Sequence, residues 1–435
     1  MRPPMVDLFF RLNFLYNVAM EHIAVEKFNE WAKEHCLSES MFDNNGNIIM
    51  KNKNDYKSTG IIARILEDKC GLYYSKFHTI IDIKRPNAPT EVQKIIDCAN
   101  KNLGATVYVC NDCDEIYFCS HTCKGKLCSS CGIKSQKIVT EKILETCIHC
   151  SHRHITFTIP QELTSWFFND LKSLDILFDA VSDTLYSVAN GRIRKKKIKK
   201  YLLGNTPGFF AFLHTFGRPL NFNPHIHVIF AEKIINKLGI AKNFIYLNYD
   251  ALSKRFQKIL LDKMMKYFGK DNFKDTKNKM YLNYPNGFYV NNRLEDDGIN
   301  FKNIEELIRY VTRYCARPCM AETRIKSYDG ENVAYWYVDH KDNSHHEVTV
   351  SSFEFIAKLL AHLLPYKFKS IRSYGFYNKS CKYYDKISNR IISKEKIGIR
   401  KELLKWKNLI LTSFNRIPIT CPKCNKLMEP TFEVS

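Results

Sequence analysis

The residues with the clearest chemical potential lie in the segment NFNPHIHVIF, Asn221 to Phe230, where two histidines flank one isoleucine. The apolar run predicts a strand, and side chains two apart in a strand face the same side. His225 and His227 therefore project together, and the apolar residues that alternate with them face the opposite layer. Two imidazoles in this arrangement can hold one divalent ion. The alternative is a pair of ordinary histidines on a half-exposed strand.

A metal site of this kind needs a third ligand. His214, in FLHTFG, lies on the preceding predicted strand. If that strand pairs antiparallel with the next one, its end comes close to His225. His154, on the first strand of the region, is the competing candidate. Either histidine could instead be buried and satisfied by backbone groups.

A pair of tyrosines follows in EELIRYVTRYCARP. Tyr310 and Tyr314 are four residues apart, so a helix would place them on one side. On a helical wheel they fall beside the apolar stripe, where the ring can pack while the hydroxyl stays available. Arg309, Arg313 and Arg317 form an adjoining basic stripe, which is either a solvated face or a phosphate-binding one.

The sixteen cysteines favour metal binding over disulfides in a reducing compartment. They include four CxxC pairs, with three further candidate ligands between the first two: Cys110/Cys113, Cys128/Cys131, Cys147/Cys150 and Cys421/Cys424, then Cys119, His121 and Cys123. We predict that the first two pairs form one structural zinc site with four thiolates. The last two pairs could form a further site, so we expect roughly one to three zinc ions. Whether this region only stabilises the fold or also recognises DNA remains open.

Changes in sequence pattern divide the chain into four regions. We predict a mainly helical region at residues 1–85, a zinc-binding domain at 86–150, a mixed α/β region at 151–365 and a basic tail at 366–435. Strands are expected at 154–160, 208–216, 224–230, 333–340 and 346–353. Helices are expected at 61–69, 162–189, 252–268, 304–315 and 353–364.

The charge balance points to a polyanionic partner. The 66 Lys and Arg residues exceed the 45 Asp and Glu residues, which gives a net charge of +21. The densest basic run, GRIRKKKIKK, is either a DNA contact or a solvated loop; its central candidates are Arg194, Lys195, Lys196 and Lys197. No run of about 18 apolar residues exists to span a bilayer. The charged N-terminal segment argues against a secretory signal, so we expect a cytoplasmic protein.

A His-apolar-His strand followed by a helix with Tyr-x-x-x-Tyr resembles the HUH single-strand endonucleases, specifically their two-tyrosine transposases. The segments LHTFGRPLNFNPHIHVIF, HITFTIP, LIRYVTRYCARPCMAETRI and FKSIRSYGFY are similar to rolling-circle transposases of the insertion sequence ninety-one family. The cysteine-rich segment from CANKNLG to CSSCG resembles that family's zinc-binding domain. The resemblance implies an α+β fold, with an antiparallel, ferredoxin-like sheet and flanking helices, and a bacterial, nucleoid-associated protein.

The resemblance also implies cleavage of one DNA strand at transposon ends by a tyrosine. His225, His227 and a third ligand would hold Mg²⁺ or Mn²⁺, and a 5′-phosphotyrosine would form. The substrate is expected to be single-stranded or locally melted, with aromatic and basic side chains along it. The sequence contains no P-loop, so unwinding would come from host replication or helicase factors, or from supercoiling. It leaves the oligomeric state open.

Three other functions are compatible with parts of this pattern. A rolling-circle replication initiator or plasmid relaxase would use the same catalytic residues. A non-catalytic, zinc-dependent DNA-binding regulator would require the histidine and tyrosine pairs to be accidental. A transposase relic would bind its DNA ends without cutting them. Strand transfer from an excised end to a new target distinguishes the transposase from the other three.

Overall fold

A computed structural model gives the fold of the 435-residue chain. It describes residues 60–99, 103–113, 115–190, 204–244, 247–292, 304–315, 317–339, 344–384, 405, 420–421, 423–426 and 428–434. Within these ranges, no helix is both long enough and apolar enough to cross a membrane.

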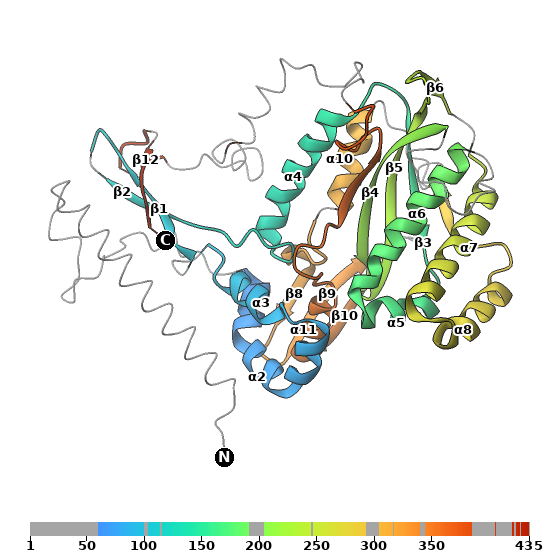
Figure 1. Ribbon diagram of the computed structural model, residues 1–435. Helices are drawn as coiled ribbons and strands as arrows, with labels where there is room; N and C mark the ends of the chain where they lie inside the picture. Colours follow the sequence, from blue (N-terminus) through green and yellow to red (C-terminus); the bar gives the residue numbers. More distant parts are fainter. Residues whose placement is uncertain are drawn as a thin grey trace.

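A six-stranded antiparallel sheet forms the centre of the protein (Figure 1). The strands run in the order β11-β4-β5-β3-β7, and β6 pairs with β5 outside this path. Their bounds are β3 His152–Thr158, β4 Asn205–Phe216, β5 Phe222–Asn236, β6 Ala241–Asn243, β7 Val290–Asn292 and β11 Ile371–Gly375. The strands predicted at 154–160, 208–216 and 224–230 are confirmed, as is the α+β class.

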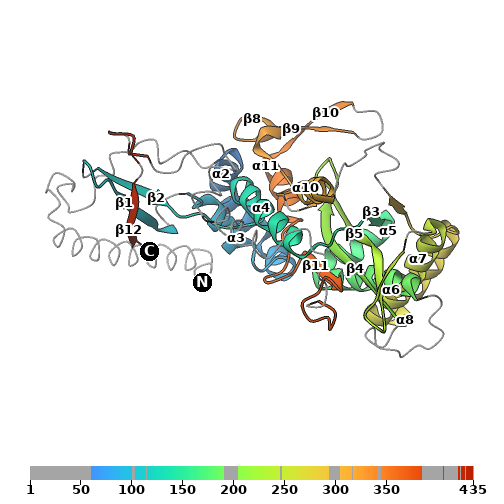
Figure 2. The same cartoon turned by 90° about the horizontal axis from the view of Figure 1, so that it is seen from above.

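The side chains of each strand alternate between the two faces of this sheet, and helices cover both faces (Figures 1 and 2). Ile226, Val228 and Phe230 face one side, as predicted, and pack under α5 Gln161–Asn169, α6 Leu174–Ala189, α7 Tyr249–Phe268 and α8 Lys270–Asn283. Ile229 and Ala231 face the other side, under α4 Ser129–Thr146 and α10 Ile304–Cys315. The histidines of β5 share this second face, because they alternate with the first set.

A smaller unit packs next to the sheet around its own core. It combines a three-stranded sheet, in the order β10-β9-β8, with three helices. The elements are α2 Ile61–Lys84, α3 Ala88–Ile96, β8 Ile325–Tyr328, β9 Asn332–Val338, β10 His345–Ser351 and α11 Ser352–Leu360. The predicted pairing of the strands near 333–340 and 346–353 is confirmed.

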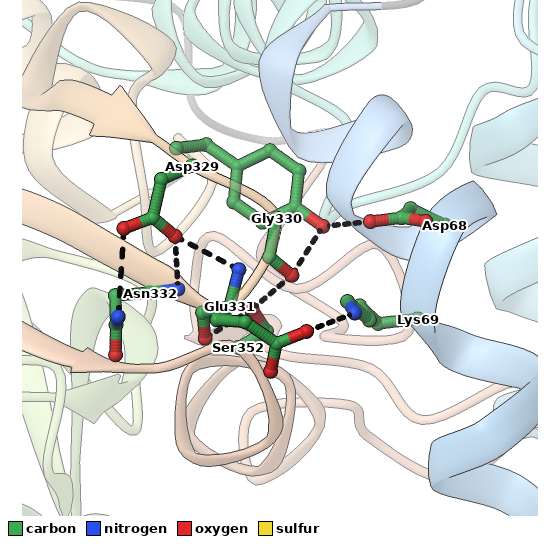
Figure 3. Close-up of polar contacts among 8 residues, drawn as sticks. Asp68, Lys69, Asp329, Gly330, Glu331, Asn332 and Ser352 are labelled. Atoms are coloured by element: carbon green, nitrogen blue, oxygen red, sulfur yellow. Dashed lines mark hydrogen bonds and ion pairs between the residues drawn. The ribbon is translucent and has the colours of Figure 1, made fainter.

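Polar contacts fix the β8–β9 turn to α2 (Figure 3). Asp329 accepts a hydrogen bond from the backbone N–H of Glu331 at 2.8 Å, which closes the turn. Lys69 on α2 donates to the Glu331 carboxylate at 2.7 Å, and the Tyr328 hydroxyl donates to Asp68. The helix that begins after Gly60 is therefore part of this unit.

A third sheet, in the order β12-β1-β2, lies at the end of the molecule away from α7 and α8 (Figures 1 and 2). Its strands are β1 Ala105–Val109, β2 Ile116–Ser120 and β12 Glu429–Val434. The last strand pairs antiparallel with β1, so the C-terminal segment returns to the cysteine-rich region.

The predicted region boundaries need correction where distant segments share a sheet. Residue 365 does not mark a boundary, because β11 pairs with β4 and the following Phe376 and Tyr377 lie buried against the central sheet. Gly375 permits this close approach: its φ is +60°, and a Cβ there would lie 1.5 Å from the carbonyl oxygen of Pro207. The helix predicted at 61–69 continues to Lys84. Residues 1–59 lie outside the described residues.

Candidate catalytic and metal sites

Three histidines on β4 and β5 converge on one face of the central sheet. His214 pairs directly with His225 across the two strands, as antiparallel pairing predicted, and His227 lies two residues further along β5. His214 Nδ1 is 3.2 Å from His225 Nε2, and ligand nitrogens of all three residues lie within 4.8 Å of one another. His225 and His227 are buried, and His214 is half-buried. Three imidazoles so placed fit one divalent ion.

Hydrogen bonds orient the two rings of β5. His225 Nδ1 lies 2.7 Å from the backbone oxygen of Asn223, to which it can donate. His227 Nδ1 lies 2.9 Å from His154 Nε2 and 3.3 Å from the Thr156 hydroxyl. Nε2 is thus the nitrogen that each β5 ring would offer to a metal. His154, the competing candidate for the third ligand, lies behind His227 as an orienting partner.

Tyr310 contacts His154, the histidine that lies next to this group. It is carried by α10, and its half-buried ring meets the His154 ring edge-on with the centroids 6.5 Å apart. The helix predicted at 304–315 is confirmed with those bounds. Tyr314 lies one turn further along α10, and its side chain is outside the described residues. The imidazoles and at least one phenol, far apart in sequence, are therefore neighbours in space.

Helix α4 supports α10 from the side away from the sheet histidines. The buried hydroxyls of Thr140 on α4 and Thr312 on α10 lie 2.7 Å apart. Arg309 on α10 forms an ion pair with Glu141 on α4 at 3.4 Å. Apolar side chains of both helices complete this contact in one core: Ile143, Leu144, Leu307, Ile308 and Val311.

Four cysteines gather at the N-terminus of α4. They are Cys98, Cys123, Cys128 and Cys131, and three of their sulfur–sulfur separations are 3.5 to 3.7 Å. Zinc–sulfur bonds of about 2.3 Å in a tetrahedron place the sulfurs about 3.8 Å apart. The backbone N–H groups of Cys123 and Gly125 point at ligand sulfurs, of Cys98 and Cys123 respectively.

A second group of four cysteines joins two segments that are far apart in the sequence. Cys110 and Cys113 follow β1, Cys421 and Cys424 precede β12, and ligand sulfurs of all four lie within 4.8 Å of one another. The predicted grouping of Cys110 and Cys113 with Cys128 and Cys131 is therefore wrong. The β1–β2 hairpin separates the first pair from α4, and β12 supplies the missing partners.

The other candidate zinc ligands have different surroundings. Cys119 packs at the edge of the second group without entering it. His121 lies between the Thr106 hydroxyl, 3.1 Å from Nε2, and the Leu103 carbonyl, 3.2 Å from Nδ1. The structure also keeps the third CxxC pair apart from Cys421 and Cys424.

That third CxxC pair lies next to the central sheet. Cys147 is buried in the core under α4, and Cys150 Sγ lies 3.8 Å from His152 Nδ1. Burial raises the pKa of the Cys150 thiol to about 11. Cys147 and Cys150, whose pairing the sequence left open, do not join the terminal pair, because Cys421 and Cys424 group with Cys110 and Cys113.

The candidate DNA-binding residues are dispersed. Arg194, Lys195, Lys196 and Lys197 lie outside the described residues. Arg309 is exposed and forms ion pairs with Glu305 and Glu141. Arg313 is also exposed on α10. Arg317 lies beyond the helix, which ends at Cys315, so it does not continue the basic stripe as predicted.

Arg317 instead borders a cavity of about 270 Å³ next to His214. The lining is mainly apolar, and exposed Lys126 and Lys369 contribute cationic groups at its edge. Lys126 donates to the Ser370 hydroxyl at 2.8 Å, which holds the cysteine-rich region against the segment before β11. Sequence analysis did not identify Lys126, Lys369 or Cys98, because each is an isolated residue whose partners come from distant segments.

Comparisons with known proteins agree with this geometry. Residues 70–159 match a family model described as a transposase zinc-binding domain, and residues 208–383 match one described as a putative transposase. The chain is 26% identical to the transposase for insertion sequence element IS801 of Pseudomonas savastanoi pv. phaseolicola, over 67% of this chain and 71% of that protein. It is 25% identical to putative transposase y4qJ of Sinorhizobium fredii, over 70% and 77%. No solved structure matches it significantly.

Proposed function

Because the chain belongs to the insertion sequence 91 family of transposases, we propose that it cuts and rejoins single DNA strands at transposon ends through 5′-phosphotyrosine intermediates. The observation that carries this proposal is the contact of the Tyr310 ring with His154, whose Nε2 lies 2.9 Å from Nδ1 of His227 in the histidine group. A phosphodiester bound there would meet a nucleophile and a metal site together.

The proposed reaction is a transesterification. The hydroxyl oxygen of Tyr310 or Tyr314 attacks the scissile phosphorus, the P–O3′ bond breaks, and the 3′ oxygen leaves with a proton as a free 3′-OH. The 5′ phosphate stays on the tyrosine. Reversal by a new 3′-OH rejoins DNA without ATP, because the phosphodiester energy is retained. Two tyrosines one helical turn apart would let the protein hold one cut end while it makes a second cut.

His214, His225 and His227 would hold the divalent cation for this reaction. When bound, Mg²⁺ or Mn²⁺ withdraws charge from a nonbridging phosphate oxygen, and an all-imidazole site favours Mn²⁺. A tyrosine of ordinary pKa near 10 is mostly protonated at neutral pH, so a nearby cation also favours the phenolate. The imidazole of His154 would keep His227 oriented.

The zinc-binding region would support the catalytic helix. Two of its cysteines, Cys128 and Cys131, lie at the start of α4, and α4 packs along α10. A zinc ion held there would fix the N-terminal end of α4. We therefore assign this first cysteine group a structural role that reaches Tyr310 through Thr140 and Thr312.

The cavity beside His214 would receive a nucleotide that flanks the scissile phosphate. Its apolar lining suits a base, and Lys126, Lys369 and Arg317 suit the adjoining phosphates. This arrangement supports a single-stranded substrate, because a base within a duplex cannot enter such a cavity without leaving its stack.

Labelled single-stranded oligonucleotides that carry the element's ends test the proposal. We expect a metal-dependent covalent adduct on the 5′ side of the break. Tyr310→Phe and Tyr314→Phe should each impair the complete reaction, and the double variant should form no adduct. Tyr281→Phe, an exposed tyrosine on α8, is the matched control and should react normally. An adduct that persists in the double variant would contradict the assignment.

Further measurements distinguish the histidine site from the zinc sites, and a transposase from the alternative functions. His225→Ala should abolish cleavage without changing zinc content, because it removes a ligand from the histidine site only. Transfer of the cleaved end to an unrelated target strand distinguishes a transposase from a replication initiator or relaxase. Binding without any adduct, at a range of Mg²⁺ and Mn²⁺ concentrations, would favour the regulator.

A further inference from the structure

The second cysteine group has the geometry of a zinc site shared by two ends of the chain. The Cys110 and Cys424 sulfurs lie 3.4 Å apart, the Cys113 and Cys421 sulfurs 3.3 Å, and the Cys113 and Cys424 sulfurs 3.7 Å. These separations are too long for disulfides, whose sulfurs are about 2.05 Å apart. They approach the roughly 3.8 Å between thiolates around one tetrahedral zinc.

The backbone around both CxxC pairs is arranged like two turns that face each other. The N–H of Cys110 donates to the Glu115 carbonyl at 2.9 Å, and the N–H of Cys421 donates to the Lys426 carbonyl at 2.8 Å. Asn425 adopts a left-handed φ of +59°, which closes the second turn. Lys426 forms an ion pair with Asp112, so the two turns also attract each other by charge.

Among the side chains that the structure describes in this sheet, only a small apolar cluster packs around these turns. Its buried cluster consists of Tyr108, Cys110, Cys421 and Met428, with Cys113, Tyr117, Cys119 and Cys424 partly buried around it. Three short strands need further stabilisation in water beyond a cluster of this size. Small folds of this kind depend on a metal, whose binding free energy becomes folding free energy.

We propose that Cys110, Cys113, Cys421 and Cys424 bind one structural zinc ion, separate from the ion at Cys98, Cys123, Cys128 and Cys131. The C-terminal segment that contains β12 is thereby an integral part of the zinc-binding region, and not an independent tail. The match to a transposase zinc-binding domain ends at residue 159, so it covers only half of this ligand set. The inference does not depend on the catalytic chemistry proposed above.

Zinc content of the purified full-length protein tests the inference. Native mass spectrometry and metal analysis should find two zinc ions in the parent chain. The double variant Cys421→Ser/Cys424→Ser should retain one, and so should Cys110→Ser/Cys113→Ser. All four substitutions together should also leave one. A matched control, Cys70→Ser/Cys381→Ser, removes two cysteines outside both groups and should keep two.

Cobalt substitution identifies the ligands even if a serine variant folds poorly. Co²⁺ bound by four thiolates has a strong thiolate-to-metal charge-transfer band, and Cys424→His should weaken this band while it keeps the ion bound. Two zinc ions in Cys421→Ser/Cys424→Ser, or an unchanged cobalt spectrum in Cys424→His, would overturn the shared site. Loss of both ions in the terminal double variant would also contradict two independent sites.

Discussion

At the scale of single residues, the proposed metal ligands on β4 and β5 have a histidine neighbour on β3 that is not in their group. His227 has a buried neighbour, His154, on the adjacent strand β3, and their nitrogens are 2.9 Å apart. Orienting partners of this kind fix the tautomer and direction of a ligand ring. We therefore propose that His154 is a positioning residue, although its sequence context is equally compatible with a third ligand.

We expect His154→Ala to weaken Mn²⁺ binding by about 10- to 100-fold, because the His227 ring loses its orienting hydrogen bond. Mn²⁺ titration followed by electron paramagnetic resonance measures this directly, without DNA. His154→Asn keeps a hydrogen-bonding group and should restore part of the affinity. His78→Ala, on exposed α2, is the control. Unchanged Mn²⁺ affinity in His154→Ala would remove His154 from the site.

Buried His362 makes the free energy of unfolding depend on pH. Burial lowers the pKa of His362 to about 4, and its ring lies 3.2 Å from the Thr215 hydroxyl. An unfolded histidine titrates near 6.5, so the unfolded state gains protons first as pH falls. The stabilisation is complete above about pH 6.5 and is lost as pH falls to about 4, by roughly 3 kcal/mol.

Urea unfolding of the parent chain and His362→Asn, at several pH values between about 7 and 5, checks this expectation. The parent should lose stability more steeply than the variant. Both proteins have the same cysteines, so acid release of zinc affects them equally. Parallel pH profiles would show that His362 does not titrate in this way.

At the scale of elements, α4 connects the cysteine-rich region to α10, the helix that carries Tyr310. The Thr140–Thr312 hydroxyl contact is buried between α4 and α10, and each hydroxyl also bonds a carbonyl of its own helix. Neither threonine is left unsatisfied if the helices part. The contact between them therefore reports on helix–helix association.

A double-mutant cycle with Thr140→Val and Thr312→Val should give an interaction energy of about 1 kcal/mol in urea unfolding. Thr184→Val provides the control, because the buried Thr184 hydroxyl on α6 bonds the Ala180 carbonyl of its own helix at 2.7 Å. Its cycle with Thr312→Val should give a value near zero. Strict additivity for Thr140 and Thr312 would contradict a specific contact.

Local sequence patterns predicted the elements of the site but not all their neighbours. The strong alternation around His225 and His227 correctly divided β5 between two faces, and the apolar stripe correctly bounded α10. The strand β11 and the mostly polar helix α8 were missed, since their positions depend on contacts with other elements. Cysteine grouping failed for the same reason, because spacing cannot distinguish a nearby CxxC pair from one brought by β12.

At the scale of the whole molecule, the net charge of +21 supplies long-range attraction for DNA. The logarithm of the association constant for a single-stranded oligonucleotide should therefore fall linearly with the logarithm of the salt concentration. The slope should be about −0.7 per phosphate contact. Removing both Lys126 and Lys369 by substitution with Ala should reduce that slope by about 1.4. Binding titrations at several salt concentrations measure this slope. Lys258→Ala, at an exposed position on α7, is the control. An equal effect of the control would exclude a specific role for the cavity lysines.

The pairing of β12 with β1 also has a consequence for synthesis. Cys110 and Cys424 are separated by 314 positions. Because ribosomes add about 5–20 residues per second, Cys424 is synthesised roughly 16–63 s after Cys110. During that interval the nascent polypeptide exposes two thiols and an unpaired strand edge. A prematurely terminated product that stops before Cys421 can never close this sheet, and quality-control proteases would meet it with that edge open.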